Sequence, residues 1–74
     1  MTNDYKEVVF LNKLARRVAQ LRREKHFTQE KLAMEAGLDR VAIANIETSK
    51  RRPTVTTLYR LAEGLQVDIS EFFK

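Results

Sequence analysis

The side chains able to make specific hydrogen bonds with a nucleic acid are concentrated between Gln29 and Arg52. Arg40 carries a planar fork of donors that matches the O6/N7 edge of guanine, and such a pair contributes about 1–3 kcal/mol of discrimination between bases. Gln29 opens an expected helix, where free N–H groups and the helix dipole favour a phosphate. The candidate DNA-binding residues are Gln29, Arg40, Val41, Ala42, Ala44, Asn45, Ser49, Lys50, Arg51 and Arg52.

These candidates differ in the contacts that they could make. Val41 and Ala42 could meet a thymine methyl group, although undirected packing is the alternative. Asn45 can reach a phosphate or face water, and the small Ala44 lets the helix lie deep in a groove. Two alanines on this face indicate few base contacts, with some specificity left to DNA shape. The cations of residues 50–52 can bind phosphates or form a solvated loop.

Two short helices joined by a tight turn must position these residues. Thr28 is a good N-cap for a helix near 29–36, and Gly37 can end that helix with φ > 0. Asp39 can cap a second helix near 40–47. Its buried edge is Ile43 and Ile46, which leaves residues 40, 41, 42, 44 and 45 largely outside the core. This pattern, over about residues 28–47, predicts a helix-turn-helix.

The remaining chain predicts three further helices and no strand. The first begins with Asn3 or Asp4 as its cap and reaches about Glu24. The fourth is capped by Thr54 after a polar loop that ends at Pro53. A short last helix runs through Phe73, because Asp68 and Glu71 resemble a capping box. The expected inward residues are Val8, Leu11, Leu14, Ala15, Val18 and Leu21 in the first helix, and Val55, Leu58, Leu61, Ala62 and Leu65 in the fourth.

The bulk properties agree with one all-α domain over residues 1–74. The net charge is +4 and the isoelectric point is near 9.8, which is typical of nucleic-acid-binding domains. The chain has no cysteine and one histidine, His26, which is interpreted as a turn residue. We therefore expect no metal, no cofactor and no enzyme activity. No apolar run suggests a signal or membrane segment, so a cytoplasmic location with no membrane partner is expected.

Apolar residues of the C-terminal region predict an interface. Residues of about 64–74 carry more apolar groups than one short helix can bury, and such patches usually mark a contact surface. Completion of the monomer core is the alternative. Phe10, Phe27 and Tyr59 are expected in or near the core. The candidate dimer residues are Leu65, Val67, Ile69, Phe72 and Phe73.

Four segments carry a resemblance to a known family. The sequences TQEKLA, AG, I-x-x-IE and KRRP-T-x-x-T-L-x-x-LA resemble the lambda-repressor-like, or XRE-type, helix-turn-helix family over about Leu21 to Phe72. The short length and the LDR opening of the second motif helix most resemble controller proteins of restriction–modification systems. That resemblance implies a five-helix fold and a homodimer on an operator of its own operon, activating at low and repressing at high concentration. A phage or plasmid repressor and an antitoxin-like interaction module are the alternatives.

The resemblance also implies roles for single residues. Gln29 would touch the DNA backbone, and Arg22 and Glu47 would form a structural ion pair between the first helix and the recognition helix. Glu30 and Glu35 are candidate contacts for RNA polymerase. Gly64 and Gln66 depart from the alanine and glycine that the family more often has there, so we expect a reshaped exit from the fourth helix.

Overall fold

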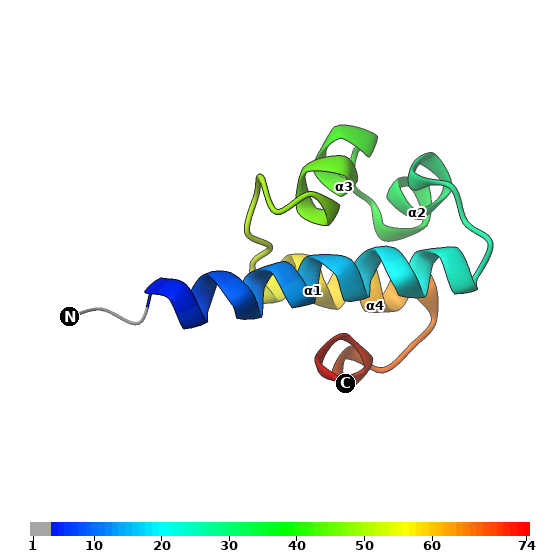
Figure 1. Cartoon of the computed structure of the whole chain (residues 1–74). Helices are drawn as coiled ribbons and strands as arrows, with labels where there is room; N and C mark the ends of the chain where they lie inside the picture. The colour runs from blue at the N-terminus through cyan, green and yellow to red at the C-terminus, as the bar shows by residue number, and fades with distance from the viewer. Residues whose placement is uncertain (1–3) are drawn as a thin grey trace.

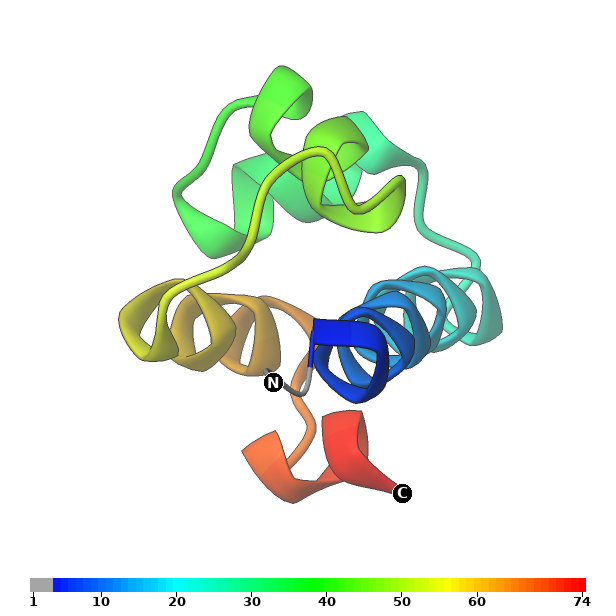
Figure 2. The same ribbon diagram turned by 60° about the vertical axis from the view of Figure 1, so that its left-hand side comes forward.

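A computed structural model describes residues 4–74 and contains helices α1 to α4 and one 3₁₀ helix, η1. Figure 1 shows α4 behind α1, with α2 and α3 above both helices, and Figure 2 shows α1 and α4 side by side with η1 beneath them. No strand occurs in the described range, so the predicted all-α class is confirmed. None of the helices within it is long and apolar enough to cross a membrane. The elements are α1 Asp4–Glu24, α2 Gln29–Ala36, α3 Arg40–Glu47, α4 Val55–Leu65 and η1 Ile69–Phe73.

The helix boundaries follow from their capping residues. Thr28 accepts a hydrogen bond from the Lys31 amide at 3.0 Å, and Asp39 accepts one from the Ala42 amide at 2.8 Å. Thr54 caps α4 in the same way. Each oxygen satisfies an N–H group that the first helical turn leaves without a partner. Asp4 is the first described residue of α1, and the alternative cap Asn3 lies outside the described residues.

The core lies between the two helix layers. Its fully buried large side chains come from α1 to α4, and burial of each contributes about 1.5–3 kcal/mol. Phe27 packs against this core, as expected. Four expected inward residues are more exposed than predicted, because they lie at the free N-terminal part of α1 or on the outer side of α4: Val8, Phe10, Val55 and Tyr59.

Helices α2 and α4 approach each other closely at Gly64. A Cβ atom built on Gly64 would lie 3.0 Å from the backbone nitrogen of Ala36 and 3.2 Å from its Cα. Real Cβ atoms rarely come so near, so the absence of a side chain permits this approach. The family more often has alanine at this position, and the close approach of α2 is a packing reason for the glycine in this chain.

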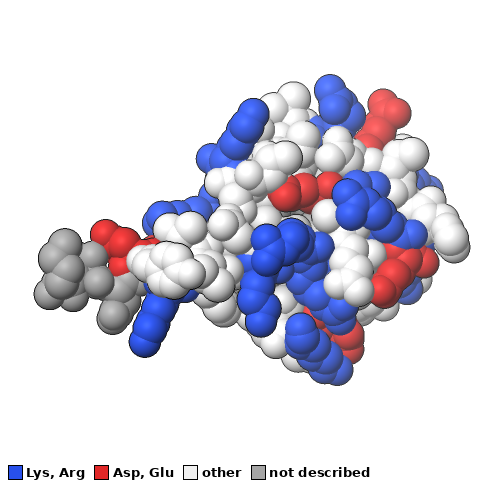
Figure 3. Space-filling model, in the orientation of Figure 1, with Lys and Arg blue, Asp and Glu red and all other residues white. Residues whose placement is uncertain are grey.

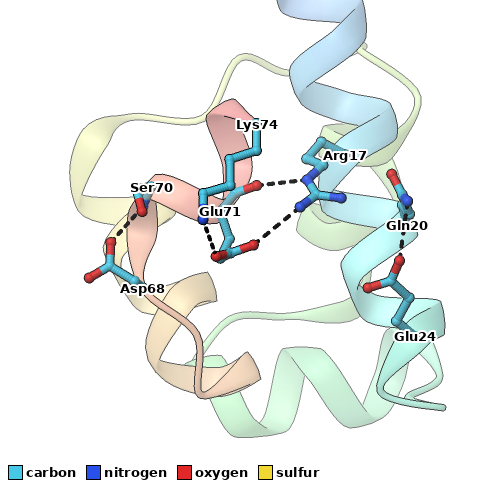
Figure 4. A network of polar contacts seen from close by, with 7 residues as sticks. All are labelled: Arg17, Gln20, Glu24, Asp68, Ser70, Glu71 and Lys74. Atoms are coloured by element: carbon cyan, nitrogen blue, oxygen red, sulfur yellow. Dashed lines mark hydrogen bonds and ion pairs between the residues drawn. The ribbon is translucent and has the colours of Figure 1, made fainter.

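The terminal segment, defined as Gln66–Lys74, turns back under α1. Gln66 has a left-handed backbone (φ 58°, ψ 44°) at the end of α4. Helices commonly end in this conformation with a glycine, so the exit that we expected to be reshaped keeps the ordinary geometry, with a glutamine in a strained position. Asp68 caps η1 through the Ser70 amide at 2.9 Å. Glu71 does not complete a capping box, because its carboxylate binds Arg17 and Lys74 instead (Figure 4).

Two of the five predicted dimer residues belong to the monomer core. Leu65 and Phe72 are almost completely buried, so the prediction of an intersubunit contact is wrong for these two side chains. Val67 and Ile69 are partly buried against the same core. Phe73 remains 54% exposed and stacks on Phe10 with ring centroids 6.4 Å apart.

Candidate nucleic-acid interface

Helix α3 presents a narrower outer face than the sequence predicted. Arg40 is exposed and Val41 is 58% exposed, whereas Ala44 and Asn45 are half-buried. Ala42 is only 5% exposed, so its prediction as a base contact is wrong. Ala42 lies four residues before the buried Ile46 and therefore shares its side of the helix.

An ion pair between α1 and α3 holds this face in place. Arg22 donates from Nε to Glu47 Oε2 at 2.6 Å and from Nη2 to Oε1 at 3.0 Å. The two side chains are only 11% and 5% exposed. The hydrogen bond to Glu47 raises the pKa of the Arg22 guanidinium, so Arg22 is charged at any ordinary pH. The predicted ion pair is thus confirmed, and its two-pronged geometry fixes the C-terminal end of α3.

Arg22 also connects this ion pair to the start of α2. Its Nη1 donates to the carbonyl oxygen of Phe27 at 2.7 Å, one residue before the N-cap Thr28. From α2, Gln29 Nε2 donates to Glu47 Oε1 at 3.1 Å. Sequence reasoning missed this contact, because nothing in the spacing of Gln29 and Glu47 indicates that they meet. One carboxylate therefore binds side chains of both α1 and α2, and Gln29 keeps a second N–H for another acceptor.

The loop after α3 is shaped by its backbone. Ser49 has a left-handed conformation with φ 63°, and the amides of Lys50 and Arg51 both donate to the Asn45 carbonyl oxygen, at 2.9 and 3.1 Å. The side chains of residues 49–52 are all exposed. Arg52 differs from its neighbours, because its Nη1 lies 3.3 Å from Glu7 Oε2 of α1.

The charged residues of the outer surface are distributed unevenly. Figure 3 shows Lys and Arg side chains gathered over α1 and the segments above it. Glu30 and Glu35 are exposed on α2, and Glu35 pairs with Lys31 at 3.0 Å. Among residues 4–74, no group of three acidic, histidine or cysteine side chains could hold a metal ion. The Lys and Arg side chains gathered over α1 (Figure 3) suit this surface to binding a polyanion.

Sequence comparison assigns this arrangement to a family. Residues 18–72 match the helix-turn-helix family HTH_3, and the chain belongs to this family of XRE-type, DNA-binding transcriptional regulators. Over 49 residues it is 45% identical to the uncharacterized HTH-type transcriptional regulator y4dJ of Sinorhizobium fredii, covering 66% of this chain and 64% of that protein. It spans only 33% of another regulator that it matches.

Two further relatives place the chain near the restriction–modification controllers. It is 38% identical to Control protein C.MunI of a Mycoplasma species over 72 residues, which is 96% of this chain and 90% of that protein. The crystal structure of the restriction–modification controller protein C.AhdI from Aeromonas hydrophila aligns with a TM-score of 0.83 and 33% identity. That alignment covers 85% of this chain and 96% of C.AhdI. The chain is therefore an XRE-type regulator similar to the controller proteins.

Proposed function

We propose that this protein is a homodimeric, sequence-specific regulator of its own operon, working in the cytoplasm as the controller of a restriction–modification system. It activates transcription at low concentration and represses at high concentration. The observation that carries the proposal is the exposed edge of α3, with Arg40 at its N-terminal end and the Arg22–Glu47 pair at the other. Similarity over nearly the whole length of C.MunI supports the controller role.

In the proposed complex, each protomer places α3 in a major groove. Arg40 reads guanine, and Val41 lies beside it against the bases. Gln29 and the cations of residues 50–51 bind phosphates and set the register of the helix. Asn45 and Ala44 lie deeper along the same face. The two half-sites lie about 34 Å apart, since a dimer reads one side of the duplex.

The first experiment is a gel shift with DNA from upstream of the gene. We expect selective binding that salt weakens, with two chains in the shifted species. Arg40→Ala should weaken operator binding by about 1–3 kcal/mol and leave binding to unrelated DNA unchanged. Lys25→Ala, which removes a positive charge in the turn before α2, is the matched control. Equal loss on both DNAs would refute base reading by Arg40.

The proposed dimer surface consists of Val67, Ile69 and Phe73, with Phe10 beside Phe73. These side chains are the part of the C-terminal apolar set that the monomer core leaves partly or largely accessible. A two-fold axis would place this patch against its own copy. Phe73→Glu should yield monomers in sedimentation equilibrium, whereas Val55→Glu, an equally apolar exposed site on α4, should not. A dimer that survives Phe73→Glu would rule this surface out.

Activation needs a contact with RNA polymerase, and we assign it to Glu30 and Glu35. Both carboxylates lie on α2, although Lys31 offsets part of the charge of Glu35. A Glu30→Lys, Glu35→Lys double variant should bind the operator normally and lose activation of a reporter gene. Retained activation by a variant that binds DNA normally would exclude this surface.

A further inference from the structure

Helix α1 carries two pairs of adjacent arginines, Arg16–Arg17 and Arg22–Arg23. In each pair, one arginine forms an ion pair within the fold and the other does not. Arg17 and Arg22 form ion pairs with Glu71 and Glu47. Arg16 and Arg23 are exposed, and neither pairs with a carboxylate within residues 4–74. One arginine of each adjacent pair therefore supports the fold, and the other keeps its full positive charge at the surface.

The two unpaired arginines share one face of α1. They are seven residues apart, which is close to two helical turns, so their side chains leave the helix in similar directions about 10.5 Å apart along its axis. This separation matches about three base-pair steps of 3.4 Å along one strand. The nearest acid along the chain, Glu24, accepts a hydrogen bond from Gln20 at 3.1 Å (Figure 4), and it forms no ion pair with Arg23.

The neighbourhood of α1 connects this face to both proposed phosphate contacts. Asn12, one turn before Arg16, lines a cavity of about 90 Å³ together with Ser49 and Arg51 of the loop. At the other end, Arg22 reaches the carbonyl oxygen of Phe27, just before Gln29. The helix thus runs past the loop and past the start of α2, and Arg16 follows Asn12 by one turn while Arg23 is the residue next to Arg22.

We infer that Arg16 and Arg23 form an extension of the DNA interface along α1 that binds phosphates flanking the sequence read by α3. The inference rests on the proposed function as a DNA-binding regulator. The chemistry is that of a guanidinium with a phosphate, which adds affinity without adding sequence information. The extension explains why α1 keeps two exposed arginines that do not stabilise the monomer through ion pairs.

The test is the salt dependence of binding by an Arg16→Gln, Arg23→Gln double variant. Each lost phosphate contact should reduce the slope of log affinity against log salt by about 0.9, so the double variant should lose about 1.8 per bound protomer. The loss should be equal for operator and unrelated duplexes. Arg60→Gln, which removes an exposed arginine of α4, should keep the wild-type slope, and thermal unfolding should confirm that all three proteins are folded.

The outcomes separate this inference from the proposed function. A wild-type protein that binds no duplex selectively would refute the regulator, while the slope on unrelated DNA would still test the α1 face. Selective binding by a double variant with the wild-type slope would refute the extension alone. A decrease of about 0.9 for Arg60→Gln, half that of the double variant, would also overturn it, because each removed charge would then count equally wherever it lies. A normal slope with lost transcriptional activation would point instead to an acidic protein surface.

Discussion

Two ion pairs tie α1 to its neighbours on different sides, and they differ in burial and in the distance between the charged groups. Arg22 and Glu47 are nearly buried and joined by two hydrogen bonds of 2.6 and 3.0 Å. Arg17 and Glu71 are 19% and 31% exposed, with a 3.3 Å contact between their charged groups. Arg17 adds a 2.7 Å hydrogen bond to the Glu71 carbonyl oxygen. The recognition helix is therefore attached to α1 by the more deeply buried pair, and the terminal segment by the more exposed one.

The strongest test of this difference removes the two carboxylates one at a time. Glu47→Ala leaves Arg22 buried without its counterion, which should cost about 3 kcal/mol or more. Glu71→Ala removes a partly exposed pair and should cost about 0.2–1 kcal/mol. The free energy of unfolding in urea measures both. Equal costs would show that burial does not distinguish the two pairs.

Gly64→Ala tests whether the packing on the recognition side is also the tighter one. The added methyl would meet the backbone of Ala36, so α2 must shift, and overpacking of this kind costs about 1–3 kcal/mol. The better helix propensity of alanine offsets about 1 kcal/mol of that cost, so we expect a net loss of stability of up to about 2 kcal/mol in chemical denaturation. Glu63→Ala, at the exposed neighbouring position, should be nearly neutral. A stabilised Gly64→Ala protein would contradict the close approach.

Gln66→Gly, at the start of the terminal segment, should raise the stability of the protein, whereas Gly64→Ala should lower it. Glutamine in a left-handed conformation is strained, whereas glycine adopts it freely. After the entropy that glycine adds to the unfolded chain, we expect about 0.5–1 kcal/mol of stabilisation in thermal or urea unfolding. Glu63→Gly, where the helix is right-handed, should destabilise by about 1 kcal/mol. A loss of stability in Gln66→Gly as well as in Glu63→Gly would argue against strain at Gln66.

The smallest expected effect is a pH dependence confined to the terminal segment. Hydrogen bonds from Ser70 lower the pKa of Asp68, and Lys74 lowers the pKa of Glu71. Since both pKa values are depressed in the folded state, the stabilisation is complete above the unfolded values and is lost as the pH falls below about 5. An Asp68→Asn, Glu71→Gln variant should lose less stability between pH 6 and about pH 3 than the wild type. An identical pH profile would refute the assignment.

The sequence predicted the helices well because their ends depend on capping residues that act within one turn of chain. Thr28, Asp39 and Thr54 need only the next turn of chain to act as caps, and Gly37 needs only its own backbone freedom. The Arg22–Glu47 pair was available through family resemblance. Local patterns were sufficient wherever the interacting residues belong to one helix or to a recognised motif.

The errors occurred where burial depends on neighbours distant in the sequence. Val55 has helical spacing with Leu58, yet it begins α4 beyond the reach of the core and is 76% exposed. In η1 the 3₁₀ geometry places residues three apart on one side, so Ile69 and Phe72 turn inward while Phe73 does not. The contacts Arg17–Glu71 and Gln29–Glu47 join residues with no shared local pattern.

One continuous helix, α1, carries both ion pairs, so α3 and the terminal segment are attached to the same helix. A dimer joined through the terminal segment would therefore hold its two α3 helices at a fixed distance and phase. Each base pair inserted between half-sites adds 3.4 Å and about one tenth of a turn, and a rigid α1 offers no hinge to absorb it. The operator of this protein should tolerate base changes in its spacer far better than changes in spacer length.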